Sequence, residues 1–283
     1  MNLRKSIFSG SWYPSDRQAC EDRIREFVEA DKYPPGSIAN PVGGIVPHAG
    51  WYFSGSIACN VIHQLAKVAS PDVVVVFGMH LHSGSPRYIM PEGKWETPFG
   101  AITVDTALAG ALTRQYTFQV ESPSQFQQDN TIELQLPFVR YFFKDARIVA
   151  MGVPPTRETL ELARSVVHAA RELDLRIVVI GSTDLTHYGP SYGFTSQGTG
   201  SKALNWVRDE NDRRVIDAMT RMDPEAVIRE GLSNDNACCC GAAAAAIAAG
   251  RAMGARKAEV MAYATSYDKN PVDSFVGYVG MLF

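Results

Sequence analysis

The sequence predicts an α/β protein with a single domain and a mainly parallel central sheet that carries helices on both faces. Strand-like apolar segments alternate with helical segments along the chain, which is the pattern of such a sheet. The run "PDVVVVFG" is continuously apolar and lies between a proline and a glycine, as is typical of a strand covered on both faces. No linker or internal repeat divides residues 1–283, and this length suits one large domain.

The elements follow from apolar periodicity and from the residues that flank it. Asp105 is expected to cap the helix that follows it, and Thr156 is expected to cap a later one. Pro137 falls inside a predicted helix, where it either begins a shorter helix or kinks a longer one. Strands are expected at 43–47, 71–78, 87–90, 100–105, 146–153, 175–181, 258–267 and 274–283. Helices are expected at 54–68, 106–115, 130–143, 156–174, 202–220, 223–231 and 237–250.

Charge and composition exclude several classes of protein. The formal net charge is −3 and Lys and Arg are scattered, so we expect neither nucleic acid nor a membrane surface as a partner. The run "ACCCGAAAAAIAAG" is shorter than the ~20 residues of a membrane span, and we interpret it as a buried helix. The N-terminus lacks the apolar region of a secretion signal, and five cysteines, three of them adjacent, suggest no disulfide framework. We therefore expect a cytoplasmic protein with reduced thiols.

Histidines gather where three of the predicted strands end. His48 follows the strand at 43–47, His80 and His82 follow the strand at 71–78, and Asp184 and His187 follow the strand at 175–181. These loops hold four of the six histidines in the chain. Because ligands of open α/β sheets bind beyond the carboxyl ends of the strands, we expect these side chains to share one site.

Imidazoles with a carboxylate suit a first-row transition metal, and two histidines with one carboxylate is the pattern of non-haem Fe(II). Asp184 and His187 are three residues apart, which places both on one side of a helical turn. Cys240 is predicted near a helix N-terminus, where the helix dipole favours a thiolate that binds metal or acts as a nucleophile. Glu133 is either a catalytic carboxylate or an ordinary helical glutamate. Cys238 and Cys239 are interpreted as small core residues.

Several motifs together resemble the MEMO family over essentially the whole chain. They are, in order, "GSWYPSD", "GIVPHAGWYFSG", "NTIELQLPFV", "STDLTHYG" and "CCCG". The resemblance implies a fold similar to class III (LigB-type) extradiol dioxygenases, which use non-haem Fe(II). It also implies an association with radical SAM proteins in prokaryotes. In eukaryotic members it implies binding of phosphotyrosine-containing segments and copper or iron redox activity.

The resemblance also implies a set of site residues. His80 is favoured over His82 as the second histidine ligand, because it lies closer to the strand end. Asn130 stands where the family often has a histidine, and an asparagine cannot shuttle a proton at neutral pH. The implied metal ligands are His48, His80, Asp184, His187 and Cys240.

Three functions remain open from the sequence. The first is a metal-dependent oxidoreductase, dioxygenase-like, that acts on a small substrate and uses Fe(II), with Cu or Zn as alternatives. Its catalytic candidates are His187, Glu133 and Cys240. The second is a module that binds a peptide or metabolite in the same cleft without turnover, which Asn130 favours. The third is a zinc hydrolase. A serine hydrolase is disfavoured, because Ser191 of "GPSYG" does not follow a strand directly.

Overall fold

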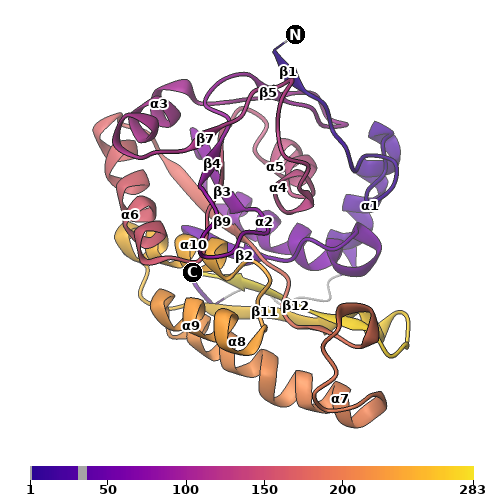
Figure 1. The fold of residues 1–283 in the computed structure, drawn as a ribbon. Helices are drawn as coiled ribbons and strands as arrows, with labels where there is room; N and C mark the ends of the chain where they lie inside the picture. Colours follow the sequence, from indigo (N-terminus) through magenta and orange to yellow (C-terminus); the bar gives the residue numbers. More distant parts are fainter. Residues whose placement is uncertain (1, 31–36) are drawn as a thin grey trace.

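The computed structural model of the chain describes residues 2–30 and 37–283, and a mixed sheet forms its centre (Figure 1). Within the described residues this sheet has nine strands in the order β10-β12-β2-β9-β3-β8-β4-β7, with β11 paired to β12. The strands β2, β9, β3 and β8 are parallel to one another, whereas β12 and β4 flank them antiparallel. The bounds are β2 Gly43–Val46, β3 Val73–Gly78, β4 Tyr88–Ile89, β7 Gln119–Val120, β8 Arg147–Gly152, β9 Ile177–Ser182, β10 His187–Tyr188, β11 Glu259–Thr265 and β12 Phe275–Leu282. The predicted α/β fold is confirmed: the four central strands are parallel, and the antiparallel strands that flank them make the whole sheet mixed.

The central strands are apolar because both of their faces are covered. Every residue of β3 is buried, as its unbroken apolar run predicted. A smaller sheet in the order β1-β5-β6 lies near the N-terminus, outside the central one. Its strands are β1 Leu3–Arg4, β5 Lys94–Trp95 and β6 Ile102–Thr103.

Helices cover both faces of the central sheet (Figure 1). On one face α2 packs against β2 and β12, and α1 and α5 pack against α2. On the other face α10 packs against β2, β3 and β9, and α6 and α9 pack against α10. The helix bounds are α1 Arg17–Glu29, α2 Ser56–Val68, α3 Thr106–Gln115, α4 Asn130–Glu133, α5 Leu136–Phe142, α6 Arg157–Glu172, α7 Gly200–Trp206, α8 Asp212–Thr220, α9 Pro224–Asn234 and α10 Cys240–Met253.

The alanine-rich helix α10 lies close against the sheet. A Cβ at Gly181 of β9 would lie 2.8 Å from both the backbone oxygen of Ala242 and the Cβ of Ala246, so small residues on both elements allow this approach. The eleven residues from Cys240 to Gly250 are all buried, as expected for this run. Among residues 2–30 and 37–283, no helix combines the length and apolarity that crossing a membrane requires.

The structure settles the open points about helix ends. Asp105 caps α3 as predicted, because its carboxylate accepts the backbone N–H of Leu108 at 2.8 Å. Pro137 stands in the first turn of α5, so the segment forms two short helices instead of one kinked helix. Thr156 precedes α6 but makes no side-chain cap hydrogen bond, which differs from the prediction. The helix expected at 202–220 is interrupted by a π-helical turn at Val207–Asn211.

Candidate metal centre

His48 is held from three directions at the end of β2. Its backbone N–H donates to Oδ1 of Asp184 at 2.7 Å, and its carbonyl accepts from Nδ2 of Asn130 at 2.9 Å. Its ring is 1% exposed, and Nδ1 lies 3.1 Å from Oγ of Ser182. The single hydroxyl proton of Ser182 is donated to the carbonyl of Thr131 at 2.7 Å. Ser182 therefore accepts from Nδ1 of His48, and Nε2 on the other side of the ring faces Sγ of Cys238 at 3.3 Å.

The ring of His80 is also oriented through its Nδ1 atom, but here the partner is a carboxylate. Oδ2 of Asp129 lies 3.1 Å from both the backbone N and the ring Nδ1 of His80. Burial favours protonation of Asp129, but hydrogen bonds from His80 and Thr131 outweigh it and lower the pKa of the carboxyl. Because a carboxylate only accepts, Nδ1 of His80 donates to Asp129. Burial lowers the pKa of His80, but its hydrogen bonds to Asp129 and Cys238 outweigh this effect and raise the pKa to about 10, so Nε2 binds a metal only after it loses a proton.

The residue before His80 has an unusual backbone. Met79 has a φ of 72°, which is uncommon for a residue with a side chain. Its N–H donates to Oγ1 of Thr131 at 2.7 Å, and the hydroxyl of Thr131 donates to Asp129. Asp129 thus fixes both this turn and the imidazole that follows it. Such backbone strain is found most often at functional sites.

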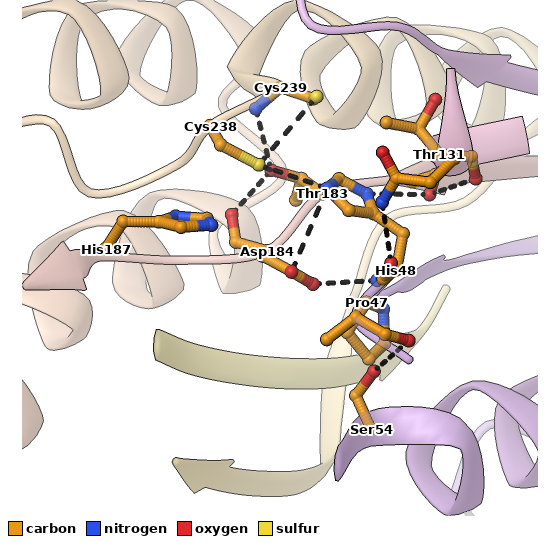
Figure 2. Close-up of polar contacts among 12 residues, drawn as sticks. Pro47, His48, Ser54, Thr131, Thr183, Asp184, His187, Cys238 and Cys239 are labelled. Carbon is orange, nitrogen blue, oxygen red and sulfur yellow. Dashed lines mark hydrogen bonds and ion pairs between the residues drawn. The ribbon is translucent and has the colours of Figure 1, made fainter. Parts of the chain in front are cut away.

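Cys238 and Cys239 lie beside His48, just before α10 (Figure 2). Sγ of Cys238 is 3.3 Å from Nε2 of His48 and 3.8 Å from Sγ of Cys239. The backbone N–H of Cys238 donates to the carbonyl of Asp184 at 3.1 Å, and that of Cys239 donates to Oγ1 of Thr183 at 3.1 Å. The ligand atoms of His48, His80, Cys238 and Cys239 all lie within 4.8 Å of one another. We call these four residues the His–Cys cluster.

The two thiols of this cluster differ in character. Burial raises the pKa of Cys238, but hydrogen bonds from Cys239 and His48, together with the charge of His48, outweigh it, so the pKa lies well below the usual value. Burial and the neighbouring Cys238 raise the pKa of Cys239. The surroundings therefore favour the ionised form of Cys238 and the neutral thiol of Cys239.

Cys240 lies outside the His–Cys cluster, which differs from the prediction. A Cβ at Gly231 of α9 would lie 2.4 Å from the Cβ and 2.5 Å from the Sγ of Cys240, so this side chain packs between α10 and α9. Burial raises the pKa of Cys240 to about 12. The cysteine at the site is Cys238, which the sequence had placed in the core.

Asp184 and His187 lie beside the cluster (Figure 2). Oδ2 of Asp184 is 3.9 Å from Nε2 of His48, and Nδ1 of His187 is 3.2 Å from the carbonyl of Leu185. The predicted helical turn is absent from this segment, because His187 opens β10 and pairs with Val276. The carbonyl of Leu185 accepts a hydrogen bond from the Nδ1–H group, which leaves Nε2 of His187 available.

The histidines and Asp184 are reached from the surface through a hollow of about 560 Å³. His48, His80, Asp184 and His187 line it together with Asn130. Its aromatic and apolar lining includes Trp12, Tyr52, Phe53, Tyr192, Val272, Val276 and Tyr278. This volume lies within the range of small-molecule sites, about 300–1,000 Å³.

Two predicted site residues lie elsewhere. His82 is exposed, and its Nδ1 accepts the N–H of Gly84 at 3.1 Å, so His80 is the histidine that meets His48. Glu133 does not line the hollow. Its carboxylate accepts the backbone N–H groups of Ile7 and Phe8 and the hydroxyl of Tyr13, at 2.8–3.1 Å. Glu133 therefore fastens the N-terminal segment.

Sequence reasoning missed four residues of the site. Ser182 and Asp129 orient the two imidazoles, and Cys238 and Cys239 bring the sulfur atoms. Asp129 could have been found as the cap of α4, because its carboxylate accepts the N–H of Thr131 at 2.9 Å. Cys238, Cys239 and Cys240 are adjacent and chemically identical, so the sequence does not show which of them lie at the site.

Replacing Asp129 with asparagine is expected to weaken metal binding at the His–Cys cluster by about 10–100-fold, which is typical of an outer-shell partner. The carboxylate would no longer fix the tautomer of His80. Titration of the metal-free protein with Zn²⁺ measures this. Asp145, an exposed aspartate, provides the matched control as Asp145→Asn. Equal affinities of the two variants would contradict this role of Asp129.

A buried carboxylate anchors the loop between Asp184 and His187. Asp212 is 0% exposed and accepts both the N–H and the hydroxyl of Thr186, as well as the hydroxyl of Tyr263 at 2.7 Å. Burial raises the pKa of Asp212 to about 6, and these hydrogen bonds offset only part of that effect.

This raised pKa predicts how the free energy of unfolding changes with pH. The protonated form of Asp212 stabilises the fold fully below the unfolded-state pKa of about 3.8, and this contribution is lost as pH rises through about 6. The expected loss is roughly 2–3 kcal/mol, from about 1.4 kcal/mol per pKa unit. Urea unfolding of wild type and Asp212→Asn between pH 4 and 7 measures it. The difference in stability between the two proteins should shift in favour of the variant as pH rises, and a constant difference would contradict the prediction.

Comparisons with known proteins agree on one family. The family model described as Memo-like protein matches residues 4–282. A MEMO1 family protein of Pyrococcus furiosus is 32% identical and covers 99% of this chain and 98% of its own length. One of Methanopyrus kandleri is also 32% identical, and one of Methanothermobacter thermautotrophicus is 31% identical, each covering at least 98% of both chains. The crystal structure of an uncharacterized Escherichia coli K12 protein has a similar fold, with a TM-score of 0.53 and 12% identity, over 85% of this chain and 98% of that one.

Proposed function

This chain belongs to the Memo-like protein family, and from that premise we propose that it binds one transition-metal ion through His48, His80 and Cys238 and uses it in redox chemistry on a small molecule. The observation that carries the proposal is the convergence of the ligand atoms of His48, His80 and Cys238 beside an open hollow that both histidines line. His–Cys donor sets of this kind are typical of transition-metal sites.

The spacing of the donor atoms supports a metal site. Ligands at 2.0–2.3 Å from a tetrahedral ion lie about 3.5 Å from one another. The Nε2–Sγ distance from His48 to Cys238 is 3.3 Å, and the distance between the two sulfur atoms is 3.8 Å. All ligand atoms of the cluster lie within 4.8 Å of one another, so an ion would draw the more distant ligands inward.

The donor set bears on which metal fits. Soft thiolate ligands favour Cu(I) and Zn, whereas imidazole also suits Fe. An Fe(II) site of two histidines and one carboxylate would use Asp184, whose Oδ2 lies 3.9 Å from Nε2 of His48. Fe(II) and Cu both serve the proposed redox function, and Zn²⁺ alone would favour hydrolysis.

The chain itself contributes orientation and acid–base groups. A bound metal would supply Lewis-acid and redox chemistry at coordination positions open to the hollow. His187 lies in the same hollow with Nε2 available, so it is the residue we propose to exchange a proton with the ligand. Asn130 contributes no proton, and its amide holds the carbonyl of His48 in place. The aromatic lining favours a ligand with an apolar or aromatic portion.

Metal analysis of protein expressed and purified without oxygen tests the metal site. We expect about one ion of Fe or Cu per chain, which His48→Ala removes and His168→Ala retains, because His168 is an exposed residue on α6. Metal-free protein that takes up neither Fe(II), Cu(I) nor Zn²⁺ would contradict the proposal.

The redox step is tested separately. Metal-loaded protein should consume O₂ in the presence of a small aromatic reductant such as a catechol, and His187→Ala should slow this reaction while keeping the metal. Metal binding without any turnover would refute the redox step and leave a ligand-binding module, the function that Asn130 favours.

A further inference from the structure

Two adjoining hollows at the far end of α10 are lined by arginines. Their volumes are about 630 and 400 Å³, and both include Arg251 and Arg256. Arg164 lines the larger hollow and Arg221 the smaller. The helix α10 begins at the His–Cys cluster, and Arg251 lies eleven residues along it, about 16 Å at 1.5 Å per residue. The arginines therefore form a feature separate from the metal centre.

The positive charge of these hollows is incompletely balanced. Two carboxylates, Asp223 and Glu225, line the hollows beside the four arginines. Glu225 lies 3.9 Å from Arg164, and Asp223 is engaged with the N–H of Ala226 at the start of α9. Within the part of the chain that the structure describes, Arg221, Arg251 and Arg256 have no ion-pair partner within 4.0 Å.

Two of the guanidinium groups are held by backbone carbonyls. Nη1 of Arg251 donates to the carbonyl of Met222 at 3.1 Å. Nη1 of Arg256 donates to the carbonyls of Arg251 and Ala255, at 3.1 and 3.0 Å. A guanidinium has five N–H donors, so several donors of each group stay available after these bonds. A group already held in place loses less entropy when it binds an anion.

We propose that these hollows bind a small anion that carries two linked phosphate groups. Guanidinium groups match phosphate oxygens with paired hydrogen bonds, and arginine is the residue most often used for this purpose. The two hollows share Arg251 and Arg256, so a diphosphate can contact the arginines of both. The other role open to them is to offset the negative end of the α10 dipole. That role alone requires no ligand.

Calorimetric titration with inorganic pyrophosphate at low salt tests the proposal. We expect saturable binding that Arg251→Gln/Arg256→Gln weakens by roughly tenfold or more, since charge-assisted hydrogen bonds are lost. The double variant Arg221→Gln/Arg256→Gln should also weaken pyrophosphate binding. It keeps the hydrogen bond from Arg251 to the carbonyl of Met222. Arg23→Gln removes the same charge from an exposed arginine on α1 and should leave binding within about twofold.

Three further variants distinguish anion binding in these hollows from binding at the metal centre and from helix capping alone. His48→Ala should bind pyrophosphate like wild type, whereas loss of binding in that variant would place the anion at the metal centre and overturn the proposal. Arg171, which donates to the carbonyl of Ala252 at 2.8 Å, caps the same end of α10 without lining either hollow. If no titration saturates, the proposal is wrong. Equal decreases in melting temperature for Arg171→Gln and Arg256→Gln would then show that the arginines only cap the helix.

Discussion

Replacing Cys238 with serine is expected to lower the affinity of the protein for a transition metal by about 100-fold or more. A hydroxyl is a far weaker ligand than a thiolate, and loss of a direct ligand exceeds the 10–100-fold effect of an outer-shell change. Sγ of Cys238 lies 3.3 Å from Nε2 of His48, so this residue supplies the sulfur closest to that imidazole. Competition with a chromophoric chelator measures the affinity.

Cys240→Ser is the matched control, because it makes the same chemical change two residues away. The side chain of Cys240 packs against Gly231 and should not affect metal affinity. The opposite result, metal loss in Cys240→Ser and retention in Cys238→Ser, would support the assignment that the family resemblance implied and contradict the one made from the structure. Cys239→Ser tests the second thiol, and this change should have a smaller effect, because the raised pKa of Cys239 makes it the poorer metal ligand.

Replacing Glu133 with alanine is expected to lower the free energy of unfolding by about 4 kcal/mol. The carboxylate is 3% exposed and accepts hydrogen bonds from Ile7, Phe8 and Tyr13, so its removal leaves several donors without a partner. Denaturation in guanidinium chloride measures the change. Metal affinity should stay within about twofold of wild type, because Glu133 does not line the hollow.

Glu172→Ala provides the comparison for this prediction. Glu172 is 67% exposed on α6, and its replacement should change stability by no more than about 0.5 kcal/mol. If the two variants are equally stable, Glu133 does not fasten the N-terminal segment. A Glu133→Ala protein that is stable but has lost its activity would support the catalytic role that the sequence left open.

The strand ends were predictable because they depend on local pattern. The apolar run at 71–78 and the Pro and Gly around it predicted β3, and a parallel sheet brings the ends of its strands to one edge. For this reason His48 and His80 could be expected to meet before their contacts were known. The choice of His80 over His82 rests on the same argument. His80 is closer to the end of β3, so it lies closer to the edge of the sheet where His48 is found.

The groups that orient these histidines come from more distant parts of the chain. Asp129 is 49 residues from His80, and Ser182 is 134 residues from His48. A local sequence pattern cannot predict these hydrogen-bonded pairs, because they depend on how α4 and β9 pack beside β2 and β3. Asp184 was expected at the same sheet edge as His48, but the hydrogen bond that its carboxylate accepts from the N–H of His48, 136 residues away, was not.

The sequence by itself determined the family, the α/β fold and the sheet edge at which His48, His80, Asp184 and His187 gather. These features follow from apolar periodicity, from proline and glycine, and from motifs that are continuous in the chain. Only the tertiary structure decided that Cys238 and not Cys240 faces the histidines, and that Glu133 fastens the N-terminus. The physical reason is that the start of α10 and its packing against Gly231 fix which of three adjacent side chains turns toward the site. That direction is a property of packing between elements, which residue identity alone does not encode.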